Sequence, residues 1–156
     1  MPMSFREKSI WISLLSSVVI FGNYFFNIIT LPSLPVEVAK LTVLGFSIRA
    51  IIFIIIVETF FQVTLAICNR KEAELDADER DKLFQYKSNS VSYSILIIGV
   101  FMTLGLIVLM EINPAIVDQF SALKVPLLTM QVLLFSFIFS EVIRFSTQLY
   151  FYRSSE

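Results

Sequence analysis

Apolar residues along the chain gather into four runs of about 20, and polar stretches separate them. The runs cover roughly residues 10–30, 46–67, 91–110 and 126–147. An α-helix needs about 20 apolar residues to cross roughly 30 Å of hydrocarbon. Ile and Val are frequent in the second run and would favour a strand in water, but its length favours a membrane helix. The pattern therefore predicts four transmembrane helices.

Composition points to the same class of protein. Of the 156 residues, 56% are hydrophobic, and the mean hydropathy is +0.79. A soluble fold carries a smaller apolar share and more charge. We expect an all-α membrane protein with a single domain over residues 1–156, whose first partner is the lipid bilayer. The net charge of −1 indicates no direct binding of nucleic acid.

Proline residues mark the ends of the predicted spans. Pro32 and Pro35 break the helix after the first run, and Pro114 follows the third. Pro126 stands at the start of the fourth run, where a first-turn proline is tolerated. The first run is longer than the apolar region of a signal peptide and has no small-residue cleavage site after it. We therefore interpret it as a retained helix.

Small and polar residues within the spans predict which faces meet. The first run carries them at helical spacing down one side: Ser13, Ser16, Asn23 and Asn27. In lipid, such a side is expected to turn toward other helices, where its amides and hydroxyls find partners. Gly99 and Thr103 in the third run predict a face for close packing.

Basic residues predict the orientation. With the N-terminus inside, the cytoplasmic segments hold eight: Arg6, Lys8, Arg70, Lys71, Arg80, Lys82, Lys87 and Arg153. The outer segments hold Lys40 and Lys124, with Arg49 at the edge. This bias predicts both termini in the cytoplasm and therefore two helical hairpins. The aromatic residues expected at the inner interface agree with it: Trp11, Tyr93, Tyr150 and Tyr152.

The segment 69–90 is the one long polar stretch, and 11 of its 22 residues are charged. We expect it to form a cytoplasmic acidic hairpin. Asp76 as N-cap with Glu79 three residues into the helix makes a capping box, so the third helix is expected to start near Ala77, in the cytoplasm. The spacing of the acidic residues could collect ligands for Mg²⁺ or Ca²⁺, but the glycine and the final Glu of an EF-hand loop are missing. The residues expected to dock a cytoplasmic partner are Asp76, Asp78, Glu79, Arg80, Asp81 and Lys87.

Ionisable residues inside the spans are costly, at about 2.5–3.5 kcal/mol each on insertion scales, and each invites an explanation. Glu58, Glu141 and Arg144 fall at similar depth in the inner half, and Gln62 lies one turn from Glu58. Two interpretations stay open: a structural ion-pair cluster, or a site where Glu58 binds a proton, a cation or a cationic substrate. At the outer ends, Arg49 and Glu111 are expected to form a second ion pair.

The two halves of the chain resemble each other weakly. Phe5, Lys8 and Ser9 ahead of the first run have counterparts 79 residues later in Phe84, Lys87 and Ser88. Such an internal repeat would relate two hairpins by an axis along the membrane normal.

Missing residue types remove several classes of enzyme. The chain has no His and one Cys, Cys68, which excludes Ser-His and Cys-His catalysis, paired-cysteine redox chemistry and His/Cys zinc sites. We therefore expect no enzyme, no catalytic residue, no cofactor and no metal site.

Two segments together resemble a known group. FREKSIWISLL at the start and DERDKLFQYKSNSVSYSIL after the second run are similar to small bacterial membrane proteins of unknown function. That group is recognised by an Asp-Glu-Arg-Asp motif before the third helix, here Asp78 to Asp81. The resemblance implies four helices and a prokaryotic inner (plasma) membrane. It also implies an association with small helix-turn-helix regulators.

Function is therefore predicted in two forms. The first is a non-enzymatic regulatory or interaction module that uses the charged hairpin and binds a cytoplasmic protein such as a small transcription regulator. The alternative is a small dimeric proton- or cation-coupled transporter that uses Glu58, as small multidrug exporters, also four-helix homo-oligomers, use a buried Glu.

Overall fold

Four long helices account for almost all of the described chain. The computed structural model describes residues 3–31, 34–70, 78–114 and 125–154, and no strand occurs within these ranges. The helices are α1 (Phe5–Ile29), α2 (Val36–Cys68), α4 (Glu79–Ile112) and α6 (Leu128–Ser154). All four are long and apolar enough to cross a membrane. The prediction of an all-helical protein with four membrane-length helices is confirmed.

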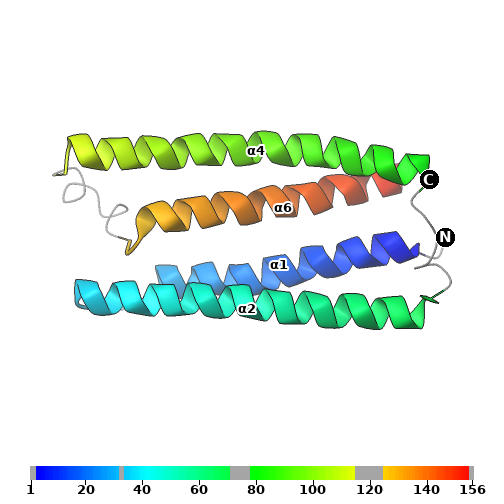
Figure 1. Ribbon diagram of the computed structural model, residues 1–156, viewed down its shortest axis with the longest axis horizontal. Coiled ribbons are helices and arrows are strands. Elements are labelled where there is room, and N and C mark those ends of the chain that lie inside the picture. The colour runs from blue at the N-terminus through cyan, green and yellow to red at the C-terminus, as the bar shows by residue number, and fades with distance from the viewer. Residues whose placement is uncertain (1–2, 32–33, 71–77, 115–124, 155–156) are drawn as a thin grey trace.

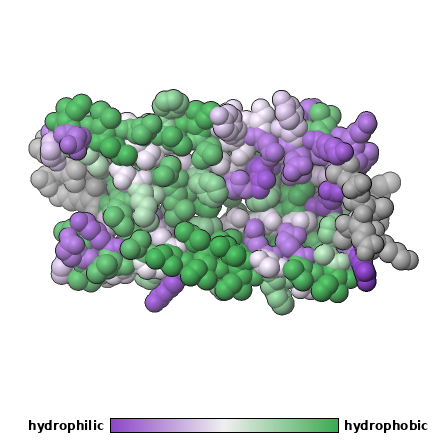
Figure 2. Space-filling view, viewed as in Figure 1, coloured by the Kyte–Doolittle hydropathy of each residue, from purple (hydrophilic) through white to green (hydrophobic). Residues whose placement is uncertain are grey.

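The helices lie side by side in the order α4, α6, α1, α2, and consecutive helices run in opposite directions (Figure 1). The closely packed pairs are α1 with α2, α1 with α6, and α4 with α6. Helix α1 begins at the same end of the molecule at which α6 ends (Figure 1). In the space-filling view, hydrophilic residues gather toward this end, whereas hydrophobic residues cover much of the rest (Figure 2).

This packing gives no support to the internal repeat. An axis that relates the two halves would make α4 the counterpart of α1 and α2 the counterpart of α6. The contact between α1 and α6 would then recur between α4 and α2, yet the closely packed pairs do not include those two helices. Helix α1 is central and α4 is peripheral (Figure 1).

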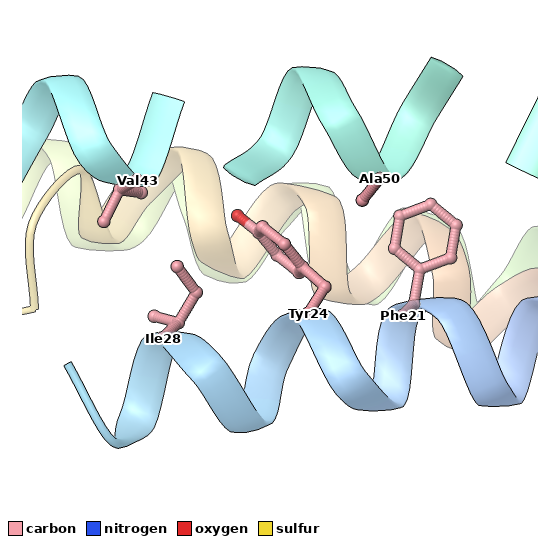
Figure 3. Packing of buried hydrophobic residues seen from close by; sticks show 5 residues of the cluster. All are labelled: Phe21, Tyr24, Ile28, Val43 and Ala50. Atoms are coloured by element: carbon pink, nitrogen blue, oxygen red, sulfur yellow. The ribbon is translucent and has the colours of Figure 1, made fainter. Parts of the chain in front are cut away.

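A stripe of buried residues explains the central place of α1. It follows the 3–4 spacing of a helix that contacts others along its whole length: Glu7, Ile10, Ser13, Ser17, Phe21, Tyr24 and Ile28. In Figure 3, the last three of these side chains point toward Val43 and Ala50 of α2. This cluster is the apolar core of the outer half of the molecule.

The predicted face of α1 is wrong for two of its four residues. Ser13 is buried, but Asn23 and Asn27 are exposed. They stand one residue before Tyr24 and Ile28, and a shift of one residue turns a side chain by about 100° around a helix. The bulky pair takes the buried positions, and Asn27 Nδ2 donates to Asn23 Oδ1 (2.9 Å) and to Asn23 O (2.8 Å).

Helices α4 and α6 meet through small residues. On α4 the buried positions include Ser92, Gly99 and Thr103, and α6 contributes Ser136 and Ser140. A Cβ atom added at Gly99 would overlap the Cβ and Oγ atoms of Ser136, so the two backbones approach as closely as a glycine allows. The prediction that Gly99 and Thr103 form a close-packing face is confirmed.

Helix α4 starts later than the sequence predicts. It begins at Glu79, and Asp78 is its N-cap, with Oδ1 accepting a hydrogen bond from the Glu79 backbone N–H (2.7 Å). The predicted N-cap, Asp76, and the predicted start at Ala77 lie outside the described residues. Asp78 can take the N-cap role because an aspartate oxygen suits either position. With 34 residues, α4 is about 51 Å long at 1.5 Å per residue, well beyond the roughly 30 Å of a hydrocarbon core.

Candidate functional site

A cavity of about 400 Å³ lies among α1, α2 and α6 in the inner half of the protein. Its polar lining includes Glu58 from α2, Glu141 and Arg144 from α6, and Ser17 from α1. Apolar side chains such as Phe21 form the rest of the wall. The structure therefore brings together the three ionisable residues that the sequence places at similar depth.

The charges in this cavity do not balance. Arg144 Nη2 donates to Glu141 Oε2, three residues away on the same helix. Glu58 receives a hydrogen bond from Ser13 and interacts electrostatically with Glu141 and Arg144. No ion pair of Glu58 within 4.0 Å is found in the described part of the chain. Two carboxylates thus share one guanidinium, and that guanidinium is already bonded to Glu141.

Arg144 is further fixed by its surroundings. Its guanidinium lies 4.5 Å from the centre of the Phe145 ring, a cation–π distance. Its Nε atom is buried and has no hydrogen-bond partner among the described residues. The cavity therefore contains an unused donor as well as a carboxylate that lacks a basic partner of its own.

Gln62 is linked to this site through α1 and not through α6. Its Nε2 donates to Ser13 Oγ (3.2 Å) and to Ser9 O (3.2 Å), and its Oε1 accepts from Ser9 Oγ (2.8 Å). Because Ser13 also hydrogen-bonds to Glu58, a short polar chain runs from Gln62 through Ser13 to the carboxylate. The predicted set of Glu58, Gln62, Glu141 and Arg144 is thus one neighbourhood in which Gln62 holds α2 against α1.

The structure does not bring Arg49 and Glu111 together. Tyr24 bonds to both Ser47 and Gln131, which sets α2 and α6 at one level. Combined with the contact between Gly99 and Ser136, this register places Arg49 at about the level of residue 102 on α4. Glu111 is nine residues further, about 14 Å along the helix. The two helices are also not a closely packed pair, and Arg49 instead lines a separate pocket between α1 and α2.

At the inner end, ionic contacts join three helices. Arg6 Nε of α1 lies 3.1 Å from Asp81 Oδ2 of α4, and the Tyr152 hydroxyl of α6 donates to Asp81 Oδ1 (2.7 Å). Arg153 Nε donates to Glu7 Oε1 (2.7 Å), and Glu7 is only 4% exposed. We call these five residues the inner clamp. An apolar cluster packs beneath it: Ile10, Phe84, Leu149 and Tyr152.

The inner clamp is the part of the site that sequence reasoning missed. Its residues come from the two segments that carry the resemblance, Arg6 and Glu7 from the first and Asp81 from the second. The signal was therefore present as two separate motifs. Their contact across 75 residues of sequence between Arg6 and Asp81 could not be read from either motif alone.

The predicted docking residues divide into two kinds. Asp78 caps α4 and Asp81 belongs to the inner clamp, so both have partners within the chain. Glu79, Arg80 and Lys87 are exposed. Among them, Arg80 lies 5.8 Å from the Phe84 ring centre, and Lys87 lies 5.3 Å from that of Phe151. Asp76 lies outside the described residues.

The fold and these polar groups define the class: a helical protein with four membrane-length helices and ionisable groups within them. A scan against protein-family models, a search of curated proteins and a search of solved structures returned no match. Function is therefore argued from the site.

Proposed function

We propose that the protein is a small membrane transporter, coupled to protons or cations, in which Glu58 is the binding residue. The single observation behind this proposal is the charge of the cavity: two carboxylates, Glu58 and Glu141, with one guanidinium that is bonded to Glu141. In a region of low dielectric constant, an extra carboxylate is costly unless a proton or a cation neutralises it. A bound proton or a cationic group meets that need at Glu58.

The surroundings of Glu58 favour a cationic substrate with an apolar body. The cavity wall is mostly aliphatic and aromatic, and its lining residues Ile51, Ile55 and Phe137 are also exposed on the protein surface. Helices α2 and α6 are not a closely packed pair, so access between them from the lipid side fits this lining. Apolar contacts would then bind the body of the substrate, and the carboxylate would select its charge.

Proton release tests this function. Tetraphenylphosphonium, a lipophilic cation, is added to purified protein in weakly buffered detergent solution while the pH is recorded. If Glu58 exchanges its proton for the cation, the wild type releases protons and Glu58→Gln releases none. Glu111→Gln is the matched control, because Glu111 is exposed and lies outside the cavity. No release from the wild type, or equal release from Glu58→Gln, would refute the proposal.

For orientation, we propose that both termini and the start of α4 face the cytoplasm, with two helical hairpins in the inner membrane of a bacterium. The bias of Lys and Arg toward this end supports it. Cys68 is exposed at the end of α2 and is the one cysteine of the chain. A thiol reagent that cannot cross membranes should label it in inverted vesicles and not in intact cells. Labelling in intact cells would reverse the orientation.

A second function, a regulatory or interaction module, is supported by the exposed charged surface of α4. Glu79, Lys82 and Lys87 have exposed side chains, and the inner clamp fixes the position of the helix that presents them. The resemblance to proteins that accompany small regulators suggests a cytoplasmic protein as partner. Charge reversal of Glu79 and Lys82 should abolish co-purification of such a partner without loss of fold, since neither residue belongs to the inner clamp. If intact protein recovers no partner, this function fails.

A further inference from the structure

The pocket that contains Arg49 has no role in the proposed function. It has a volume of about 410 Å³ and lies between α1 and α2, away from the Glu58 cavity. Its polar lining is Asn23, Asn27 and Arg49, and its apolar lining includes Val19, Phe46 and Phe53. Arg49 is the one charged side chain among the described residues that line it.

Arg49 lies within the span and not at its edge. The hydrogen bond between Tyr24 and Ser47 sets the register of α1 and α2, so Arg49 is level with about residue 22 of α1. Helix α1 continues for seven more residues to Ile29, or about 10 Å at 1.5 Å per residue. The guanidinium is exposed at this depth, and no ion pair to it is found among the described residues. An exposed, uncompensated Arg inside the hydrocarbon is costly.

The donors in this pocket are suited to an acidic group. Arginine presents five N–H donors and no acceptor, in a planar fork that matches a carboxylate or a phosphate. Asn27 donates to Asn23, which orients the Asn23 amide, and no described atom accepts from Asn23 Nδ2. The pocket thus offers a cation and an amide donor beside an apolar surface.

A second copy of the chain at this surface would not supply the missing negative charge. On α2, Glu58 is nine residues from Arg49, which places it on the opposite side of the helix at about 100° per residue. Glu37 is 12 residues away, about 18 Å toward the outer end, and it is bonded to Lys40. Two copies that meet at this face would bring two guanidinium groups together without a carboxylate.

We infer that the pocket binds an anionic amphiphile, with its phosphate or carboxylate on Arg49 and Asn23 and its chain along Val19, Phe46 and Phe53. The acidic group compensates the buried charge, and the aliphatic chain fills an apolar groove that faces the bilayer. A phospholipid and a free fatty acid share this chemistry.

Spin-labelled lipids test the inference. The full chain is reconstituted in phosphatidylcholine vesicles with a trace of labelled phosphatidylglycerol, stearic acid or phosphatidylcholine, and the motionally restricted fraction is measured. We expect Arg49→Gln to lower the preference for the anionic labels over phosphatidylcholine by about tenfold at this site, the value of one lost charge-assisted pair. Arg49→Lys keeps the charge but loses the fork and should fall between. Lys40→Gln, at the outer end of α2, should leave the preference unchanged.

The outcomes separate the sources. Loss of preference for phosphatidylglycerol alone identifies a phospholipid, and loss for stearic acid alone identifies a free acid. An unchanged preference in Arg49→Gln overturns the inference. So does rapid disulfide formation between copies with Val19→Cys in a Cys68→Ser background, because a second copy would then cover the pocket. Failure here leaves proton release at Glu58 unaffected, since Arg49 does not line that cavity.

Discussion

The contact between Gly99 and Ser136 predicts a large effect from one methyl group. In Gly99→Ala, the new Cβ would lie closer than 3.0 Å to both Cβ and Oγ of Ser136 and 3.5 Å from its Cα. Carbon atoms prefer a separation of about 3.5–4.0 Å, so α4 and α6 must move apart by at least ~0.5 Å. A gap of that size already forfeits about a quarter of the dispersion energy at neighbouring contacts.

The cost can be isolated with a second glycine on the same helix. A Cβ added at Gly105 meets nothing within 4 Å. Both alanine variants gain about the same helix propensity, ~1 kcal/mol, so the difference between their unfolding free energies reports the clash. We expect Gly99→Ala to be less stable than Gly105→Ala by about 1–3 kcal/mol, the usual cost of overpacking. Unfolding in mixed micelles with increasing sodium dodecyl sulfate, followed by circular dichroism, measures both.

A rescue variant completes the test. Ser136→Gly removes the atoms that the new methyl group strikes, so the double variant should recover stability with a coupling energy of about 0.5–3 kcal/mol. Equal stabilities for Gly99→Ala and Gly105→Ala, or no coupling with Ser136→Gly, would refute the close approach of α4 and α6.

Three further predictions follow from polar contacts. Tyr24→Phe removes the hydroxyl that joins α2 and α6 and should cost about 0.6–1.7 kcal/mol in the same titration, the range for hydrogen bonds between membrane helices; an unchanged midpoint would contradict it. Arg153→Ala leaves the buried Glu7 carboxylate without its partner and should cost about 1–3 kcal/mol, and adding Glu7→Gln should restore part of this loss; a double variant less stable than Arg153→Ala would argue against the pair. Asp81→Asn weakens the link to Arg6, so amide hydrogen exchange in the first turns of α4 should accelerate, and equal exchange rates would show that the link does not hold this end.

The sequence alone was sufficient for the helices and for some of their faces. Runs of about 20 apolar residues determine membrane-length helices because each helix satisfies its own backbone hydrogen bonds, whatever surrounds it. Gly99 was recognisable for a similar reason, since a small residue in a span permits close approach wherever the partner is. The depth of Glu58, Glu141 and Arg144 could also be counted from the span ends, and the three do share a cavity.

Only the tertiary structure decided which groups meet. Arg49 and Glu111 were paired by counting from the ends of predicted spans, but α1 has 25 residues and α4 has 34, so the ends do not mark equal levels. Asn23 and Asn27 share the helical spacing of the buried stripe and miss it by one residue, because Tyr24 and Ile28 pack there. The inner clamp joins residues up to 146 positions apart. Contacts of this kind depend on the relative rotation and register of helices, which the packing of all four sets together and no single segment encodes.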